Sequence, residues 1–455
     1  MNIAGLNVRI MIQKNETVTD RIGNHRSVWT DYFPCWATAS DQTGDESEEA
    51  SQTKEKERID FTVRYCSETA AVTSKGYRIL LGDQIYNIKH ADDMAFKKNS
   101  RKFQTEREAA DDAVMIQLKE WCDVNRPELS HLFELVQEYR KWNKITSTYI
   151  TGYLKYVNPV TGCIHPNFYA LSTDTGRFSC NSPNLQNAPR KTNDPIGVRN
   201  FIKAPEGHLI VSCDYSQIEL RVGAHYCQDR TMMETYRTGG DIHAATTSVI
   251  FNIPYAQAQD KHAENYKERR TIAKNVNFGT FYGLFPRGLQ KTLKFKAGVD
   301  KSVSECEEII RNLKAGYPAL VTWQEETKAD AARRMYSETR LGRRRYLPNI
   351  RSDDWGKKSF AERCSMNTPI QGTAADIIKL SLGRLLEGLP ERPWLKPILQ
   401  IHDELTFIIP EGKITEAVSY IKSCMEPQPF PEFDLPLVAE ASAGRTFGSM
   451  EELED

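Results

Sequence analysis

Along the first hundred residues, apolar and polar positions alternate with the two-residue period of β-strands. The segments that carry this period are VRIMIQK (8–14), IDFTVRY (59–65), YRILL (77–81) and QIYNI (84–88). Gly, Asn, Asp and Ser separate them, and Gly82-Asp83 is typical of a tight hairpin. The pattern predicts a small all-β domain, a barrel or sandwich, over residues 1–106. Within it, the polar stretch 45–57 predicts a solvated loop.

From about Arg107 the apolar positions recur at helical spacing. The segments 110–122 and 129–145 both follow this spacing, and Pro127 separates them. After Thr151, loops, short strands and long helical stretches alternate to the end of the chain. The composition therefore changes sharply once, near residue 106.

Two apolar, strand-like runs end in carboxylates. HLIVSCD ends at Asp214, and LQIHDELTFII places Asp403 and Glu404 between two β-branched runs, as at the tip of a hairpin. If Asp214 and Asp403 lie side by side, their charges need a cation, and hard oxygen ligands suit Mg²⁺. Two such ions can activate an attacking oxygen and stabilise a leaving one. The plain alternative is that each acid caps a turn or pairs with an arginine.

The segment 267–284 combines basic and aromatic residues at intervals of four. Arg270, Lys274, Phe278 and Tyr282 would form one slowly drifting stripe on a helix. Two cations followed by two aromatics match the phosphates, sugar and base of a nucleoside triphosphate, although an ordinary amphipathic helix has the same pattern. The polar loop 173–190 has the amide and guanidinium donors that contact phosphates and minor-groove acceptors.

Composition adds few constraints. A chain of 455 residues allows about three domains. The net charge of −1 hides a basic cluster at 339–346, so it does not argue against a nucleic-acid partner. The 10 cysteines include no C-x-x-C pair, which favours reduced thiols over zinc or a disulfide framework. Without a signal-like or membrane-spanning apolar run, we expect a soluble cytoplasmic protein and no membrane partner.

Three stretches carry a resemblance to a known family. DYSQIELR (214–221), the segment from Arg270 to Gly283 and HDE (402–404) resemble motifs A, B and C of the family A DNA polymerases, in the same order. The resemblance spans about 135–455 and implies an α+β, right-hand fold with an antiparallel palm sheet. Its implied parts are a truncated helical thumb (107–150), a palm in two pieces (151–240 and 363–455) and helical fingers (241–362).

The resemblance also implies roles for individual residues. The catalytic set is Asp214, Asp403, Glu404 and Lys274, and two Mg²⁺ ions would be bound by Asp214, Asp403 and the backbone carbonyl of Tyr215. The implied deoxynucleotide-binding residues are Arg270, Lys274, Phe278, Tyr282, His243, Glu219 and Gln217. The implied contacts to primer–template DNA are Arg177, Asn184, Gln186, Asn187, Arg363, Asn367, Gln371 and His402. Glu219 would crowd the 2′ position and exclude ribonucleotides, and Lys274 would act as the general acid for pyrophosphate.

Residues 3–106 resemble phage head-closure, or head–tail adaptor, proteins. Together the two resemblances imply a phage-encoded DNA-templated DNA polymerase without a 3′–5′ exonuclease, working in the cytoplasm of a bacterial host. Its implied partners are primer–template DNA, deoxynucleoside triphosphates and phage head–tail components. Two alternatives remain: a phage structural fusion with an inert, truncated polymerase, and a single-subunit RNA polymerase, against which Glu219 argues.

Overall fold

The computed structural model describes residues 6, 8–19, 25–41, 48–49, 52–53, 58–74, 76–82, 84–92, 100–106, 112–189 and 194–453. The chain divides into two compact units, 1–143 and 144–455. Within the described ranges, no helix is long and apolar enough to cross a membrane.

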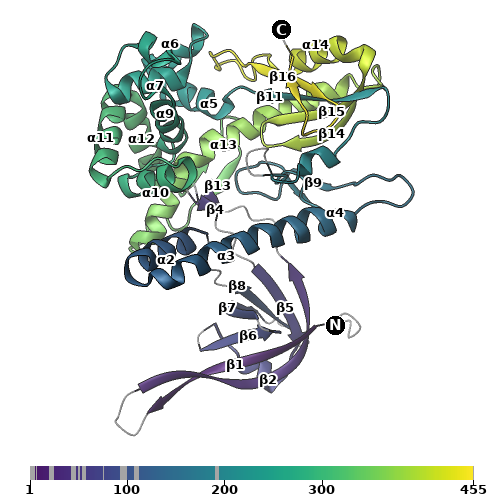
Figure 1. Cartoon of the computed structure of the whole chain (residues 1–455), viewed down its shortest axis with the longest axis vertical. Helices are drawn as coiled ribbons and strands as arrows, with labels where there is room; N and C mark the ends of the chain where they lie inside the picture. The colour runs from purple at the N-terminus through teal and green to yellow at the C-terminus, as the bar shows by residue number, and fades with distance from the viewer. Residues whose placement is uncertain are drawn as a thin grey trace. The chain divides into compact units, whose positions relative to one another are not determined.

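The first unit contains a closed antiparallel barrel (Figure 1). Its strands follow the order β1, β2, β5, β8, β7, β6 around the wall, and β6 pairs with β1 to close it. Their bounds are β1 (Val8–Thr19), β2 (His25–Asp41), β5 (Arg58–Arg64), β6 (Tyr77–Leu81), β7 (Gln84–Asp92) and β8 (Ser100–Glu106). Alternate residues such as Ile12, Phe61, Val63 and Phe103 fill the interior and are fully buried. The all-β region predicted from the two-residue period is therefore confirmed.

Two local features explain how this barrel is built. Leu81 pairs with Gln84 across the β6–β7 turn, and Gly82 adopts a positive φ of 59° there; its predicted companion Asp83 lies outside the described residues. The buried Arg101 donates to the carbonyl oxygens of Ala70 and Val72, both at 2.7 Å. These bonds attach the short helix α1 (Ser67–Ala71) to strand β8.

The polar stretch 45–57 is not entirely a loop. The short strands β3 (Glu48–Glu49) and β4 (Gln52–Thr53) pair with each other in it, which corrects the prediction for these four residues. Backbone pairing between short strands does not depend on the polarity of the sequence, and here Glu48 pairs with Thr53 and Glu49 with Gln52. The other residues of this stretch lie outside the described residues.

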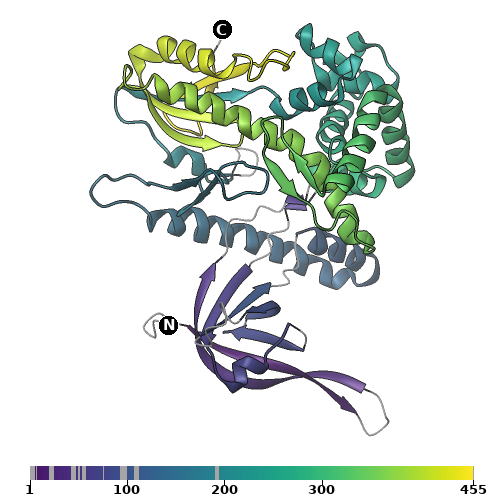
Figure 2. The same cartoon turned by 180° about the vertical axis from the view of Figure 1, so that it is seen from behind.

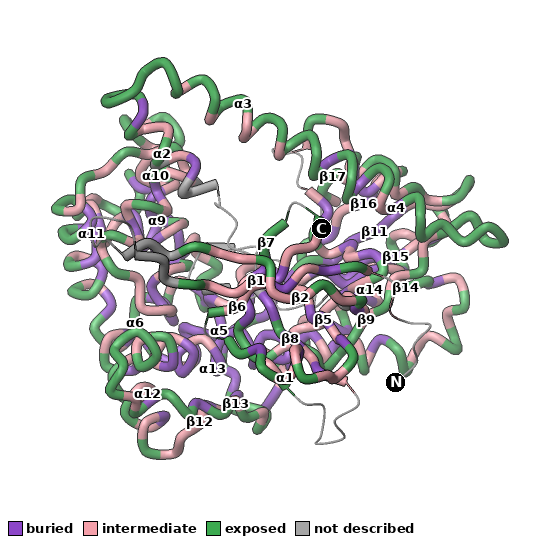
Figure 3. Tube along the Cα trace, turned by 90° about the horizontal axis from the view of Figure 1, so that it is seen from below, coloured by how far each residue is buried: buried purple, intermediate pink, exposed green. Residues whose placement is uncertain are grey.

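Two helices follow the barrel. They are α2 (Asp112–Asn125) and α3 (Pro127–Lys144), and Pro127 begins the second one, where its missing N–H is not needed. Helix α3 has no buried residue, and its tube in Figure 3 is coloured exposed and intermediate. The second unit then opens with a π-helical turn, η2 (Ile145–Ile150), and α4 (Thr151–Leu154).

The second unit is built on a five-stranded antiparallel sheet of order β14, β15, β11, β16, β17. The bounds are β11 (His208–Tyr215), β14 (Lys396–Ile401), β15 (Glu404–Pro410), β16 (Ala439–Gly444) and β17 (Glu451–Glu452). Both faces are covered: Val211 and Cys213 join the core beneath α13 (Trp355–Glu387) and α14 (Ile414–Met425), whereas Ile210 joins a cluster with Tyr149 and Tyr153. Figure 2 shows these two helices lying along the sheet.

A group of helices joins β11 to the rest of the sheet. They are α5 (Ile218–Cys227), α6 (Arg230–Arg237), α7 (Ile242–Phe251), α8 (Tyr255–Gln259), α9 (Tyr266–Thr280), α10 (Pro286–Ala297), α11 (Val303–Gly316) and α12 (Pro318–Arg334). Helix α7 packs against α9 and α11, and α5 packs against α13. The mixed helix and sheet content agrees with the predicted α+β class.

Candidate active site

The ends of adjacent strands bring the two predicted carboxylates together. Asp214, near the end of β11, pairs in register with Glu404, the first residue of β15, and the backbone N–H of Tyr215 donates to the carbonyl oxygen of Asp403 at 3.2 Å. On its other side Asp214 pairs with Glu440 of β16. The hairpin tip predicted from the sequence is therefore present, and it lies beside the end of β11.

The electrostatics of this cluster reflect four acids near one another. The surrounding protein atoms, followed by the carboxylates of Asp403, Glu404 and Glu440, raise the pKa of Asp214 to about 8. Burial also raises the pKa of Glu404, although its carboxylate accepts a hydrogen bond from the Ser212 hydroxyl. The cluster therefore holds more negative charge than it can neutralise by itself, which favours a bound cation.

The backbone turns that aim these acids adopt an uncommon conformation. Gln217, at the start of α5, has a φ of 57°, and His402, directly before Asp403, has a φ of 55°. Gln400 stabilises the second turn by donating to the carbonyl oxygen of His402 at 2.6 Å. Gln186 donates in turn to the backbone and side-chain oxygens of Gln400, both at 3.0 Å, and so ties the loop 173–189 to the hairpin.

Helix α9 ends before the last residue of the basic and aromatic stripe that the sequence predicted. It ends at Thr280, so Arg270, Lys274 and Phe278 share the helix but Tyr282 lies in the turn beyond it. Gly283 explains this end, because its φ of 74° is left-handed and the N–H of Leu284 returns to the carbonyl oxygen of Gly279 at 3.1 Å. The prediction of one continuous four-residue helical stripe was wrong at its last member.

The turn nevertheless places Tyr282 usefully. Its hydroxyl donates to one carboxylate oxygen of Glu219 at 2.6 Å, and the Arg177 guanidinium donates to the other. Burial and the adjacent Glu219 carboxylate raise the pKa of Tyr282 well above its usual value, so it remains a neutral donor. We call Arg177, Glu219 and Tyr282 the Glu219 clamp. It joins three segments that are distant in the sequence.

Two cationic side chains and a histidine gather at the start of α7 and along α9. Arg270 forms an ion pair with Asp241, the N-cap of α7, at 2.6 Å, and the Lys274 ammonium is exposed on the same side of α9. Their positive charges act on His243, whose ring centre lies 6.4 Å from that of Phe278. Phe278 is 43% exposed. The structure thus brings together four of the residues assigned to nucleotide binding.

The residues assigned to DNA contacts have varied surroundings. The side-chain oxygen of Asn184 accepts from the N–H of Gln186 at 3.0 Å, whereas Asn187 offers its backbone oxygen to Tyr149 at 3.0 Å. Gln371 is buried on α13 beside Tyr282. On the same helix Arg363 donates to Ser359 at 2.8 Å, and the side-chain oxygen of Asn367 is buried with no partner in the described part of the chain. Gln217, which is assigned to the deoxynucleotide instead, accepts a hydrogen bond from the Tyr236 hydroxyl at 3.2 Å.

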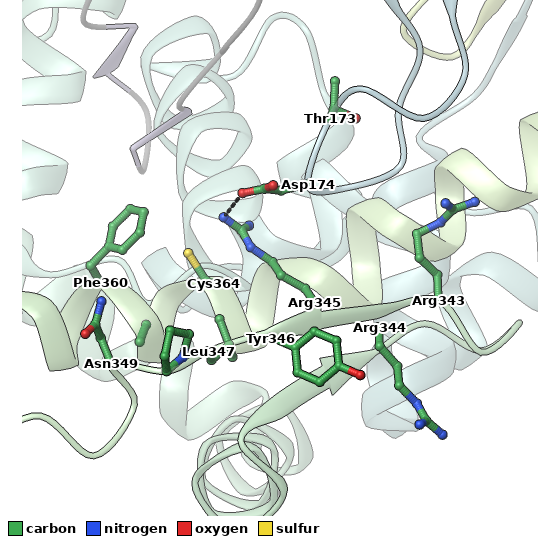
Figure 4. A pocket seen from close by; sticks show the side chains of 12 residues that line it. Thr173, Asp174, Arg343, Arg344, Arg345, Tyr346, Leu347, Asn349, Phe360 and Cys364 are labelled. Carbon is green, nitrogen blue, oxygen red and sulfur yellow. Dashed lines mark hydrogen bonds and ion pairs between the residues drawn. The ribbon is translucent and has the colours of Figure 1, made fainter. Parts of the chain in front are cut away.

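A cleft of about 410 Å³ lies between the loop at 173–174, the strand β13 (Arg344–Tyr346) and the first half of α13. Arg343, Arg344 and Arg345 line it, and each has its own acidic partner. Figure 4 shows Arg345 directed at Asp174, to which it is bonded at 2.8 Å. The basic cluster seen in the sequence is therefore part of this cleft wall.

The sequence reasoning missed several residues that support the site. They are Ser212, Asp241, Asn277, Gln400 and Glu440, each of which contacts or pairs in register with a predicted residue. Most of them are polar side chains inside apolar runs, as in VSCD or LQIHD. A polar residue two positions before a predicted site residue is a usable signal. Glu440 gave no such signal, because only the pairing of β16 with β11 brings it close to Asp214.

Family models match two parts of this chain. Residues 69–449 match the model described as DNA polymerase family A, and residues 1–104 match that of phage head completion protein. The two matches overlap between 69 and 104. In the structure most of those residues belong to the barrel, because β6 pairs with β1 and β8 pairs with β5.

Individual relatives agree with the first match. The chain is 38% identical over 321 residues to the thermostable DNA polymerase I of Thermus filiformis, covering 69% of this chain and 36% of that protein. It is 39% identical over 297 residues to DNA polymerase I of Geobacillus stearothermophilus, covering 65% and 32%. This chain thus spans about a third of the length of these relatives.

A solved structure agrees as well. The POL domain of Pol1 from M. smegmatis, in complex with DNA primer-template and dNTP, is similar with a TM-score of 0.64 and 30% identity, over 75% of this chain and 57% of that one. The polymerase model covers well over half of the residues, and the motif residues lie together in the same unit. The chain therefore belongs to DNA polymerase family A.

Proposed function

We propose that this chain is a DNA-templated DNA polymerase that adds deoxynucleotides to a primer 3′-hydroxyl, acts in phage DNA replication and has no 3′–5′ exonuclease. The observation that carries the proposal is the meeting of Asp214 and Asp403 at the ends of adjacent strands. Family membership and the primer–template complex of the M. smegmatis relative support it.

The acidic cluster fits two Mg²⁺ ions. Asp214, Asp403 and the backbone carbonyl of Tyr215 are the hard oxygen donors that would hold them. In the described residues no three His, Cys, Asp or Glu side chains converge as a metal group, so the remaining ligands would be water and substrate phosphate oxygens, as Mg²⁺ prefers. When bound, these ions would supply charge neutralisation and a lower pKa for the attacking hydroxyl.

The protein's own residues would position the nucleotide. Arg270, Lys274 and His243 would donate to the triphosphate, and the exposed Phe278 ring offers a surface for the sugar and base. The Glu219 clamp would occupy the space beside C2′, so that a ribose hydroxyl meets a carboxylate already engaged on both oxygens. Lys274 would give a proton to the departing pyrophosphate.

The parts of a right hand are assigned on the same basis. We assign 151–240 and 363–455 to the palm, 241–362 to the fingers, 107–150 to a residual thumb and 1–106 to a separate domain. Arg177, Asn184, Gln186, Asn187, Arg363, Asn367, Gln371 and His402 would line the duplex and the primer end. The described residues of this thumb form two helices, α2 and α3, in place of a longer thumb, so we expect low processivity.

Primer extension tests the proposal. The assay uses a short primer–template, Mg²⁺ and four deoxynucleotides with the full chain, its Asp403→Ala variant and a Glu411→Ala control. Glu411 follows the same hairpin but pairs with Arg445, so this control should keep its activity. Extension by the wild type that only Asp403→Ala abolishes is the expected result. A folded wild type that extends no primer would refute the proposal.

Lys274 has its own test. Lys274→Ala should reduce the incorporation rate much more than the affinity for primer–template, because the proton it supplies is needed only as pyrophosphate leaves. Fluorescence anisotropy measures the affinity for primer–template, and single-turnover incorporation measures the rate. Equal losses in both would remove its role as general acid.

The match of residues 1–104 favours a second role for the barrel. A barrel that resembles phage head completion proteins could attach the polymerase to phage head–tail components. Co-sedimentation of the chain with phage particles would support this role. Failure of the barrel to co-sediment, with intact primer extension, would leave the polymerase as the sole function proposed for the chain.

A further inference from the structure

A chain of buried hydrogen bonds ends at the Nδ1 atom of His243. The Tyr317 hydroxyl lies 2.9 Å from the Thr246 hydroxyl, which donates to the side-chain oxygen of Asn277 at 2.7 Å, and the Asn277 amide nitrogen lies 2.9 Å from His243 Nδ1. Tyr317 and Thr246 are fully buried, and Asn277 and His243 are 2% and 7% exposed. Helix α7, helix α9 and the junction between α11 and α12 contribute these side chains, so the network is built by the fold.

The orientation of the Asn277 amide gives this network a direction. The Thr246 hydroxyl donates its one proton to the side-chain oxygen of Asn277, and the amide nitrogen of Asn277 faces the histidine. An amide nitrogen only donates, and therefore Nδ1 must accept and carry no proton. The single proton of a neutral imidazole is then on Nε2.

The surroundings of His243 agree with a neutral ring. Burial lowers the pKa of His243 to about 4; the Asp241 carboxylate opposes this shift, and the Arg270 and Lys274 charges add to it. These are the charged groups that face the ring from the N-cap of α7 and from α9. Nε2 makes no hydrogen bond to a described residue, and it is not among the sealed, unpartnered atoms of the described side chains. Nε2 is therefore not fully sealed, and the ring that carries it lies near Phe278 and within the influence of the Arg270 and Lys274 charges.

We propose that Asn277 is a positioning residue that holds His243 as the neutral Nε2–H tautomer, so that the ring donates through Nε2 to an oxygen of the incoming nucleoside triphosphate. This inference rests on the proposed polymerase function for its ligand, but the tautomer itself does not. Without the network a neutral imidazole could place its proton on Nδ1, and the Nε2 lone pair would then repel a phosphate oxygen.

The tautomer can be read in the wild-type chain by nuclear magnetic resonance. The chain is labelled with ¹⁵N-histidine, and His243 is assigned among the nine histidines by the signal lost in His243→Gln. At pH 7 and without nucleotide, we expect a protonated Nε2 and an unprotonated Nδ1. A protonated Nδ1, alone or in an imidazolium, would overturn the proposal whatever the activity of the enzyme.

Asn277→Asp tests the consequence for substrate binding. A carboxylate keeps the size and still accepts from Thr246, but its second oxygen favours a proton on Nδ1. The KM for the templated deoxynucleotide should rise about tenfold or more at pH 8, with kcat changed much less, because a bond to the bound triphosphate is lost. At lower pH an extra proton shared by the new carboxylate and His243 restores the Nε2–H donor, so the ratio of variant to wild-type KM should fall towards one.

Asn275→Asp is the matched control. Asn275 lies on the same helix, and its substitution by Asp adds the same charge. Its amide, however, donates to the backbone oxygen of Thr271 at 2.8 Å. This control should raise KM only slightly and without a change of the ratio between pH 6 and 8. A pH-independent loss in Asn277→Asp, or an equal rise in Asn275→Asp, would contradict the positioning role.

Thr246→Val provides a milder variant if Asn277→Asp does not fold. Removing the Thr246 hydroxyl frees the Asn277 amide to rotate, so both tautomers of His243 should be populated and KM should rise by a smaller factor. An unchanged tautomer and KM in a folded Thr246→Val variant would show that the network does not set the proton. If wild-type primer extension fails while the tautomer is as expected, the proposed function is wrong but the network remains.

Discussion

Removing the carboxylate of Glu219 should affect both stability and sugar selection. Glu219 accepts one hydrogen bond from the Arg177 guanidinium and one from the Tyr282 hydroxyl, and the Glu219 and Arg177 side chains are only 17% and 23% exposed. Breaking a buried ion pair costs about 3–5 kcal/mol, and residual solvent contact reduces this figure. We expect Glu219→Ala to cost about 3 kcal/mol, or about 6 °C in Tm.

A Gln at this position separates charge from size. Glu219→Gln keeps an acceptor for one partner and nearly the same volume, so it should cost about half as much, about 1.5 kcal/mol. Glu219→Ala also opens space beside Tyr282. The kcat/KM for a ribonucleotide relative to its deoxynucleotide should therefore rise at least about tenfold in the Ala variant, about 1.4 kcal/mol, and less in the Gln variant.

Calorimetry and single-nucleotide incorporation give both quantities. Glu234→Ala is a suitable control, because Glu234 is exposed on α6, and its Tm should change by about 1 °C or less. A Glu219→Ala variant as stable as wild type would refute the clamp. A destabilised variant with unchanged sugar selection would keep the clamp but refute its place beside C2′.

Three further perturbations test other parts of the chain. Without divalent cations the Tm should fall as pH rises from about 4 towards 8, because the folded-state pKa of Asp214, about 8, lies above its ordinary value of 3.8. Mg²⁺ should reverse this fall. In calorimetric scans the Asp214→Asn variant should show neither effect. Gly372→Ala would place Cβ 2.4 Å from the Thr339 side chain and should lower the free energy of unfolding by about 1–3 kcal/mol. Gly383→Ala, on the same helix with nothing within 4 Å, should raise the free energy of unfolding by up to about 1 kcal/mol. Equal effects of the two substitutions in denaturant titrations would contradict this packing. Arg101→Leu should lower the unfolding free energy of the barrel by about 2–3 kcal/mol, since two carbonyl oxygens lose their donor, and an unchanged thermal transition would argue against that attachment.

The sequence predicted best what depends on near neighbours. The two-residue period located the barrel strands, the apolar runs around Asp403 predicted its hairpin, and Pro127 marked a helix boundary. Pairings between distant segments were out of reach. Nothing in the sequence of β16 indicates that it lies beside β11, so the contribution of Glu440 to the charge around Asp214 could not be inferred. The same holds for Asn277, because its partner on α7 is 34 positions away along the chain.

The backbone at the acidic cluster departs from what local turn rules predict. Gln217 and His402 take a left-handed conformation that costs non-glycine residues about 1–2 kcal/mol and that turn chemistry assigns to Gly or Asn. Gln217 follows Asp214 by three positions, and His402 directly precedes Asp403. Two hydrogen bonds hold the turn at His402: the Gln400 side chain donates to the carbonyl oxygen of His402, and the N–H of Tyr215 on the adjacent strand donates to that of Asp403. A turn fixed by such bonds brings the carboxylate of Asp403 close to that of Asp214, which local preference would not favour, and this arrangement is what the proposed pair of metal ions would require.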